Sequence, residues 1–116
     1  MPILLTIVLS LIIATPAVAD FEPIDDRSSF VEIVQDKKLK IPFVQLEVLL
    51  SGEVTGSGLG QPVNGTWTWK DRYFCRTLVW GRSELAYDCQ TVYATSNHIR
   101  FSADRGRGDS VTFRIR

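Results

Sequence analysis

The chain has 116 residues, of which 13 are basic and 13 acidic, so its formal net charge at pH 7 is zero. A chain of this length has room for a single domain. The balanced charge supplies no electrostatic attraction to nucleic acid or to an anionic membrane surface, and we expect neither as a partner.

The N-terminus has the pattern of a signal peptide. An apolar run over residues 3–14 is followed by Ala17-Val18-Ala19, a small-x-small cleavage site, although no Lys or Arg precedes the run. The run is shorter than the ~20 residues of a membrane-spanning helix, and Pro16 interrupts it. We predict that residues 1–19 are cleaved and that the mature chain is periplasmic or secreted, with no membrane span. An uncleaved membrane anchor is the alternative.

Residues 20–38 form a segment ahead of the predicted sheet. It starts with an extended, poorly patterned lead-in over residues 20–24. Capping residues follow, Ser29-x-x-Glu32 matches a capping box, and an apolar stripe at i, i+3, i+4 spacing is made of Phe30, Ile33 and Val34. We expect one short helix of about ten residues, with its apolar stripe on the sheet or across one end of it.

From Leu39 onward the hydrophobic period changes to two, and turn residues recur roughly every eight to twelve positions. The candidate strands are residues 39–42, 44–50, 53–57, 63–70, 73–80, 84–93, 98–103 and 110–115. Because the connections are so short, neighbouring strands must be antiparallel. We predict a mainly β fold, in which an antiparallel meander over residues 39–116 forms a small barrel of about seven or eight strands, with one N-terminal helix and one disulfide.

Two independent signals place Cys75 opposite Cys89. In an exported chain, two cysteines favour a disulfide because the compartment is oxidising. If the turn after Trp80 is Gly81-Arg82-Ser83, then Trp80 faces Glu84 and the same register pairs the two cysteines. The bond would close a loop of about fifteen residues, for which the chain-entropy model gives about 3 kcal/mol of stabilisation.

The alternation also predicts which side chains face the interior. With Asp71-Arg72 as a two-residue turn, Trp69 faces Phe74. One face of the central strands then collects Trp67, Trp69, Phe74, Arg76, Leu78, Trp80, Ala86 and Asp88. Because this face holds most of the aromatic side chains, we expect it to be the interior, with both cysteines on the other face.

Three polar residues fall on this interior face, because Arg76 lies opposite Asp88 and Gln90 follows. A buried Arg–Asp pair costs desolvation energy that its attraction only partly returns, so its role is either structural or ligand-binding. In the second interpretation Arg76 presents its guanidinium to an anionic or carbonyl-bearing ligand between aromatic walls. The candidate ligand-binding residues are Trp67, Trp69, Phe74, Arg76, Trp80, Asp88 and Gln90.

Residues 65–81, 88–90 and 99–108 together resemble a group of small, uncharacterised exported bacterial proteins that share the pattern GxWxWxDxYFCRxLxWG…CQ…RFxxDxGxG. The match covers most of residues 30–116, although members usually have Asp-Gly where this chain has Asp71-Arg72. Some members carry the name dihydrodipicolinate reductase. The residues argue against that chemistry, since no amphipathic helix follows the glycine-rich residues 56–60 to make a dinucleotide site. More loosely, the fold that the pattern implies is similar to lipocalin-like small barrels.

These observations favour a binding or interaction module of the bacterial envelope that takes a small molecule or a protein. An inhibitor of an envelope hydrolase is the alternative, and the lead-in over residues 20–24 is the segment that would serve it. An enzyme is less favoured, because the sequence contains no evident nucleophile–base pair, metal-binding cluster or phosphate loop. His98 is the single histidine. We expect no cofactor and no metal.

Overall fold

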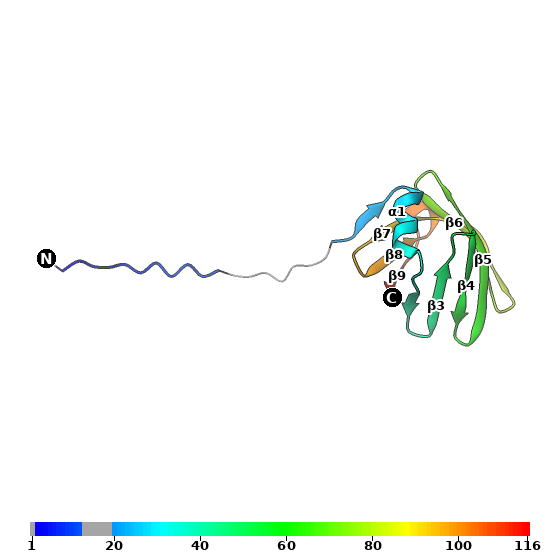
Figure 1. Ribbon diagram of the computed structural model, residues 1–116, viewed down its shortest axis with the longest axis horizontal. Helices are drawn as coiled ribbons and strands as arrows, with labels where there is room; N and C mark the ends of the chain where they lie inside the picture. Colours follow the sequence, from blue (N-terminus) through cyan, green and yellow to red (C-terminus); the bar gives the residue numbers. More distant parts are fainter. Residues whose placement is uncertain (1, 13–19) are drawn as a thin grey trace.

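The computed structural model describes residues 2–12 and 20–116, and the second of these ranges contains all of the secondary structure (Figure 1). Residues 2–12 are exposed and form neither helix nor strand. The predicted cleavage site at Ala17-Val18-Ala19 lies outside the described residues. Within the two described ranges, no helix combines the length and the hydropathy that crossing a bilayer requires.

The secondary structure consists mainly of strands. In chain order the elements are β1 (Glu22–Ile24), α1 (Arg27–Val34), β2 (Leu39–Ile41), β3 (Val44–Val48), β4 (Glu53–Gly58), β5 (Gln61–Lys70), β6 (Tyr73–Trp80), β7 (Ser83–Ala94), β8 (His98–Ser102), the short 3-10 helix η1 (Asp104–Gly106) and β9 (Ser110–Ile115). All eight strands predicted from Leu39 onward are present, and none differs from its prediction by more than two residues at either end. The period-2 pattern therefore located the strands correctly.

Strands β2 to β9 form a closed antiparallel barrel. Each of β2 to β6 pairs with the strand that follows it, β8 pairs with β7 and β9, and β9 returns to β2. Closure leaves none of these strands as a free sheet edge, which protects the barrel from edge-to-edge association. The structure confirms the predicted mainly β fold with one helix and one disulfide within the described residues.

Strand β1 differs from the prediction, in which residues 20–24 were only an extended lead-in. Glu22–Ile24 pair antiparallel with residues 92–94 of β7. The pairing of β6 with β7 ends at Phe74 and Gln90. Beyond Gln90, β7 pairs with β1 in place of β6. Three residues are too few to show a hydrophobic period, and tertiary pairing alone makes them a strand.

Helix α1 is capped by Asp26 and not by the predicted capping box. The Ser29 amide donates to Asp26 Oδ1 at 2.8 Å, and the Ser29 hydroxyl donates to Oδ2 at 3.0 Å. The backbone hydrogen bond, followed by the side-chain one, lowers the pKa of Asp26 because both stabilise the ionised carboxylate. Ser29 is therefore the donor in the first turn and not the N-cap, so the prediction of Ser29-x-x-Glu32 was wrong.

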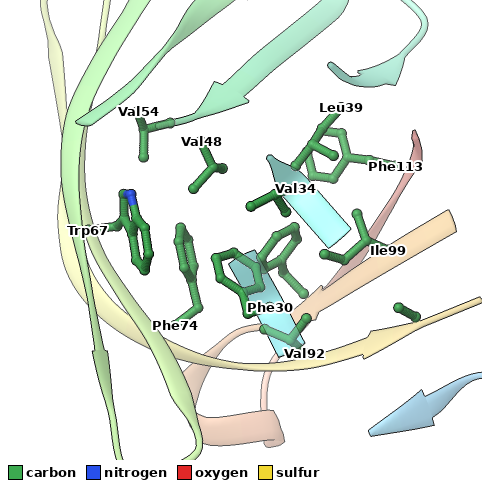
Figure 2. Close-up of a cluster of buried hydrophobic side chains, with 12 residues drawn as sticks. Phe30, Val34, Leu39, Val48, Val54, Trp67, Phe74, Val92, Ile99 and Phe113 are labelled. Carbon is green, nitrogen blue, oxygen red and sulfur yellow. The ribbon is translucent and has the colours of Figure 1, made fainter. Parts of the chain in front are cut away.

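Phe30 occupies the centre of the core. Its side chain is 0% exposed, and the centroid of its ring lies 5.4, 5.1 and 5.2 Å from those of Trp67, Trp69 and Phe74. Figure 2 shows Phe30 and Val34 of α1 among side chains that point inward from the strands. The helix thus fills the end of the barrel at which β5 turns into β6, one of the two placements that its apolar stripe predicted.

The turns confirm one predicted register and correct another. Lys70 pairs with Tyr73, so Asp71-Arg72 is a two-residue turn as predicted. Trp80, however, pairs with Ser83, so the next turn is only Gly81-Arg82 and the predicted three-residue turn was wrong. The register then shifts between Arg76 and Leu78, where β7 carries one extra residue in a β-bulge.

The bulge restores the predicted pairing of the cysteines. Beyond it Cys75 opposes Cys89, and their Cα atoms lie 3.9 Å apart in the disulfide. On the other side of the bulge, Leu85 faces Leu78, and the predicted interior position of Ala86 was wrong. One inserted residue therefore reverses the alternation in the first part of β7 while leaving the second part as expected.

Replacing Phe30 by Ala should lower the free energy of unfolding by about 3–5 kcal/mol, because the cavity would lie between three aromatic rings. Urea denaturation of the full chain measures this loss. Ser28→Ala, an exposed change on the same helix, is the control and should change stability by less than about 0.5 kcal/mol. A Phe30→Ala loss as small as that of the control would contradict the central role of this side chain.

Removing the disulfide by the double change Cys75→Ala and Cys89→Ala should cost about 3 kcal/mol of stability, because the unfolded chain loses a constraint on a short loop. Thermal and urea unfolding of the wild-type chain, oxidised and reduced, provide the comparison. The reduced wild type should match the double variant. Equal stability of the oxidised and reduced chains would show that the barrel does not rely on this bond.

Candidate ligand-binding site

The structure divides the predicted site residues between a packed half of the barrel and an open half. Trp67 is 4% exposed, and its indole N–H donates to the Leu49 carbonyl at 2.7 Å. The Trp69 indole donates to the Asp71 carbonyl at 2.9 Å. With both rings against Phe30 and both N–H groups bonded, these tryptophans belong to the core and are not walls of the interior cavity.

The open half contains a cavity of about 100 Å³. Its wall comes from seven strands and is apolar apart from Arg76 and Gln90, with Phe74 on the side of the packed half. This volume is smaller than the about 300–1,000 Å³ of a pocket for a drug-sized ligand. It is of the same order as an engineered apolar cavity of about 150 Å³ that binds benzene. The cavity can therefore hold part of a small ligand.

An apolar groove of about 230 Å³ adjoins this cavity at the open end of the barrel. Leu46 and Leu78 line both spaces, so a ligand that occupied the two would pass between these side chains. Trp80 lines the groove on the same face as Leu78, as predicted, but it is 37% exposed because it lies at the rim and not inside the barrel. Its indole donates to the Gly58 carbonyl at 2.8 Å, and this bond holds the ring at the rim.

Two turn residues at the same end of the barrel expose large apolar side chains. Phe43 is 81% exposed with φ +65°, and Leu59 is 63% exposed with φ +50°. The Leu59 amide donates to the Phe43 carbonyl at 2.8 Å, so the two turns are joined. A left-handed backbone is strained for residues other than Gly or Asn, so Phe43 and Leu59 each cost conformational energy. Each also exposes a large apolar side chain to water, which is a second cost. Such placement is typical of a contact surface.

Phe43 and Leu59 were not among the predicted site residues. A signal was present in Pro42-Phe43 and Leu59-Gly60, two tight turns that carry an apolar residue where Asn, Asp or Gly is usual. That both turns lie at the open end follows from the meander, since alternate turns of an antiparallel barrel fall at the same end.

Arg76 lines the cavity and is only half-buried. Its Nη1 donates to the Ala86 carbonyl at 2.7 Å. Desolvation lowers the pKa of Arg76, and the negative charge of Asp88 opposes this effect. The side chain stays a cation with several N–H donors, of which the described residues bond one.

Asp88 opposes Arg76 in the register, as predicted, but the two side chains do not form an ion pair. One Asp88 oxygen accepts from Gln90 Nε2 at 2.9 Å, and the other accepts from the Asp104 amide at 3.0 Å. Among residues 2–12 and 20–116, the only ion pair within 4.0 Å joins Arg107 to Asp104. The predicted Arg–Asp contact is therefore replaced by a carboxylate that fastens η1 to β7, which leaves Arg76 available.

No protein-family model matches the chain, and neither a curated protein nor a solved structure matches it. The resemblance to exported bacterial proteins therefore stays a prediction. In the described part of the chain, no group of three or more His, Cys, Asp and Glu residues lies close enough together to hold a metal ion.

Replacing Asp88 by Ala should release the start of η1, because the Asp104 amide would lose a charged acceptor. We expect hydrogen exchange at that amide to quicken by about tenfold or more. Nuclear magnetic resonance of the full chain measures the rate. Glu84→Ala, an exposed change on the same strand, should leave the rate unaltered. An Asp104 amide that exchanges equally slowly in Asp88→Ala would disprove the anchoring role.

Proposed function

We propose that the protein is an exported binding module that takes a small ligand with an apolar body and an acceptor head group through the open end of its barrel. The observation that carries this proposal is the pair of adjoining spaces, an apolar groove open to solvent and an apolar cavity with a guanidinium and an amide in its wall. The disulfide and the apolar N-terminal run support export to the periplasm or beyond.

The order of residues along β6 suggests how such a ligand lies. The strand runs from Tyr73 beside the packed half to Trp80 at the rim, and Arg76 precedes Leu78 on the way. A head group that reaches Arg76 must therefore pass the apolar rim first. The cavity holds only the head and the atoms next to it, so the apolar body occupies the groove between Trp80 and Leu59.

A carbonyl or carboxylate oxygen fits this arrangement best, because Arg76 and the Gln90 amide are donors. A carboxylate gains most, since charge-assisted hydrogen bonds are about twice as strong as neutral ones. Arg76 is the one cation among the described residues that line the cavity, so a dianion would lack a second positive partner. The ligand class that we propose is an aliphatic monocarboxylate or a neutral carbonyl compound of similar shape.

Octanoate and octanol test the proposal, with tryptophan emission as the signal because Trp80 lies in the groove. We expect saturable binding of both, with octanoate the tighter ligand. Arg76→Met should weaken octanoate by about tenfold or more and leave octanol nearly unchanged, since only the carboxylate uses the guanidinium. Arg82→Met, at an exposed arginine outside the cavity lining, is the matched control. An equal loss for both ligands, or no saturable binding, would count against the proposal.

Inhibition of an envelope hydrolase is the second candidate function, and the exposed Phe43 and Leu59 favour it. The segment predicted to insert into a hydrolase was the lead-in over residues 20–24. In the structure Glu22–Ile24 pair with β7 as strand β1, so this segment is not a free extension. The joined turn tips are the alternative element for entry into a partner's cleft. Phe43→Ser would then abolish inhibition of peptidoglycan hydrolysis by a lysozyme while leaving octanoate binding unchanged, because Phe43 does not line the groove.

A further inference from the structure

A second, polar pocket of about 330 Å³ lies on the outside of the barrel, where β7 changes partner from β6 to β1. It shares no lining residue with the interior cavity or with the groove at the rim. Two arginines line it, Arg72 from the β5–β6 turn and Arg105 from η1, and Asp25 is the one acidic residue among its described lining. The pocket therefore carries a net positive charge.

Both arginines are exposed, and neither has a carboxylate within 4.0 Å among the described residues. The guanidinium carbon of Arg105 lies 5.7 Å from the centroid of the Tyr73 ring, which also lines the pocket. A guanidinium that rests on an aromatic ring is held in place, yet it keeps its in-plane N–H donors for a ligand. Arg105 is thus positioned in advance of binding.

The backbone of η1 is strained at the position that carries this arginine. Arg105 has φ 55° and ψ 34°, in the left-handed region where glycine is favoured, and Asp104 before it has φ 50°. The Asp88 carboxylate holds the Asp104 amide, and the Ala103 carbonyl accepts from the Gly106 amide at 3.1 Å. The fold thus maintains an arginine where glycine would be less strained, and strain of this kind gathers at functional sites.

We propose that this outer pocket binds an oxyanion, either a carboxylate or a phosphate group, between Arg72 and Arg105. The planar guanidinium groups of Arg72 and Arg105 can each donate two hydrogen bonds to the oxygens of a carboxylate or a phosphate. Charge-assisted hydrogen bonds from both arginines would outweigh the repulsion between the anion and Asp25. The site is independent of the barrel cavity, so it does not rest on the ligand proposed for that cavity.

Amide chemical shifts of the full chain, followed during titration with inorganic phosphate and separately with acetate, test the site at an ionic strength held constant with sodium chloride. We expect saturable shifts at Tyr73, Arg105 and Gly106. Saturation by phosphate alone identifies a phosphate site, and saturation by both anions identifies a general oxyanion site. Shifts that increase linearly with either salt, without saturation, would overturn the proposal.

Variants separate binding from structure. Arg105→Gln should weaken the anion by about tenfold or more, and Arg82→Gln, at an exposed arginine in the β6–β7 turn, should leave it unchanged. Arg105→Gly should abolish binding without lowering the Tm, because glycine suits the left-handed backbone. Unaltered binding in Arg105→Gln would overturn the proposal, and so would a fall in Tm in Arg105→Gly. Octanoate binding at the barrel cavity should be the same in all three variants, which keeps the two sites distinguishable.

Discussion

The contact of Phe30 with the aromatic side chains of β5 and β6 holds helix α1 inside the barrel and so sets how much of the interior is filled. An eight-stranded barrel has an interior just wide enough to be filled by side chains, and here one helix supplies part of the filling. Because α1 is eight residues long, Phe30 and Val34 fill only one end. The opposite end keeps a cavity. The filled end therefore stabilises the fold, and the unfilled end is the one that we propose binds a ligand.

A single inserted residue in β7 decides the chemistry of the cavity wall. The β-bulge reconciles a two-residue turn at Gly81-Arg82 with the pairing of Cys75 and Cys89, so the disulfide and Arg76 stay in the register that the later part of β7 requires. Asp88 then bonds Gln90 and the Asp104 amide on its two oxygens, and it does not neutralise Arg76 directly. An unneutralised guanidinium in an apolar wall is a natural partner for an acceptor atom.

Local and global preferences disagree at several positions, and three of these lie at the two proposed sites. Phe43 and Leu59 combine left-handed backbone with exposed apolar side chains at the rim, and Arg105 combines the same backbone with a free guanidinium at the outer pocket. Sequences that fold well violate such rules mainly where function requires it, which is why these residues carry the proposals.

Side-chain period and turn residues are local signals, so the strand positions, their antiparallel order and the short helix could all be predicted from the chain's pattern. The Cys75–Cys89 pairing was also predicted correctly, but through a three-residue turn that the structure replaces by a two-residue turn and a β-bulge. Three features could not be predicted from local pattern. These are the strand formed by Glu22–Ile24, the bulge in β7, and the division between Trp67 and Trp69, which pack on Phe30, and Arg76, which lines a cavity. The side-chain period assigns a residue to a face of the sheet, whereas the space left empty on that face depends on how far a helix from elsewhere in the chain reaches into the barrel.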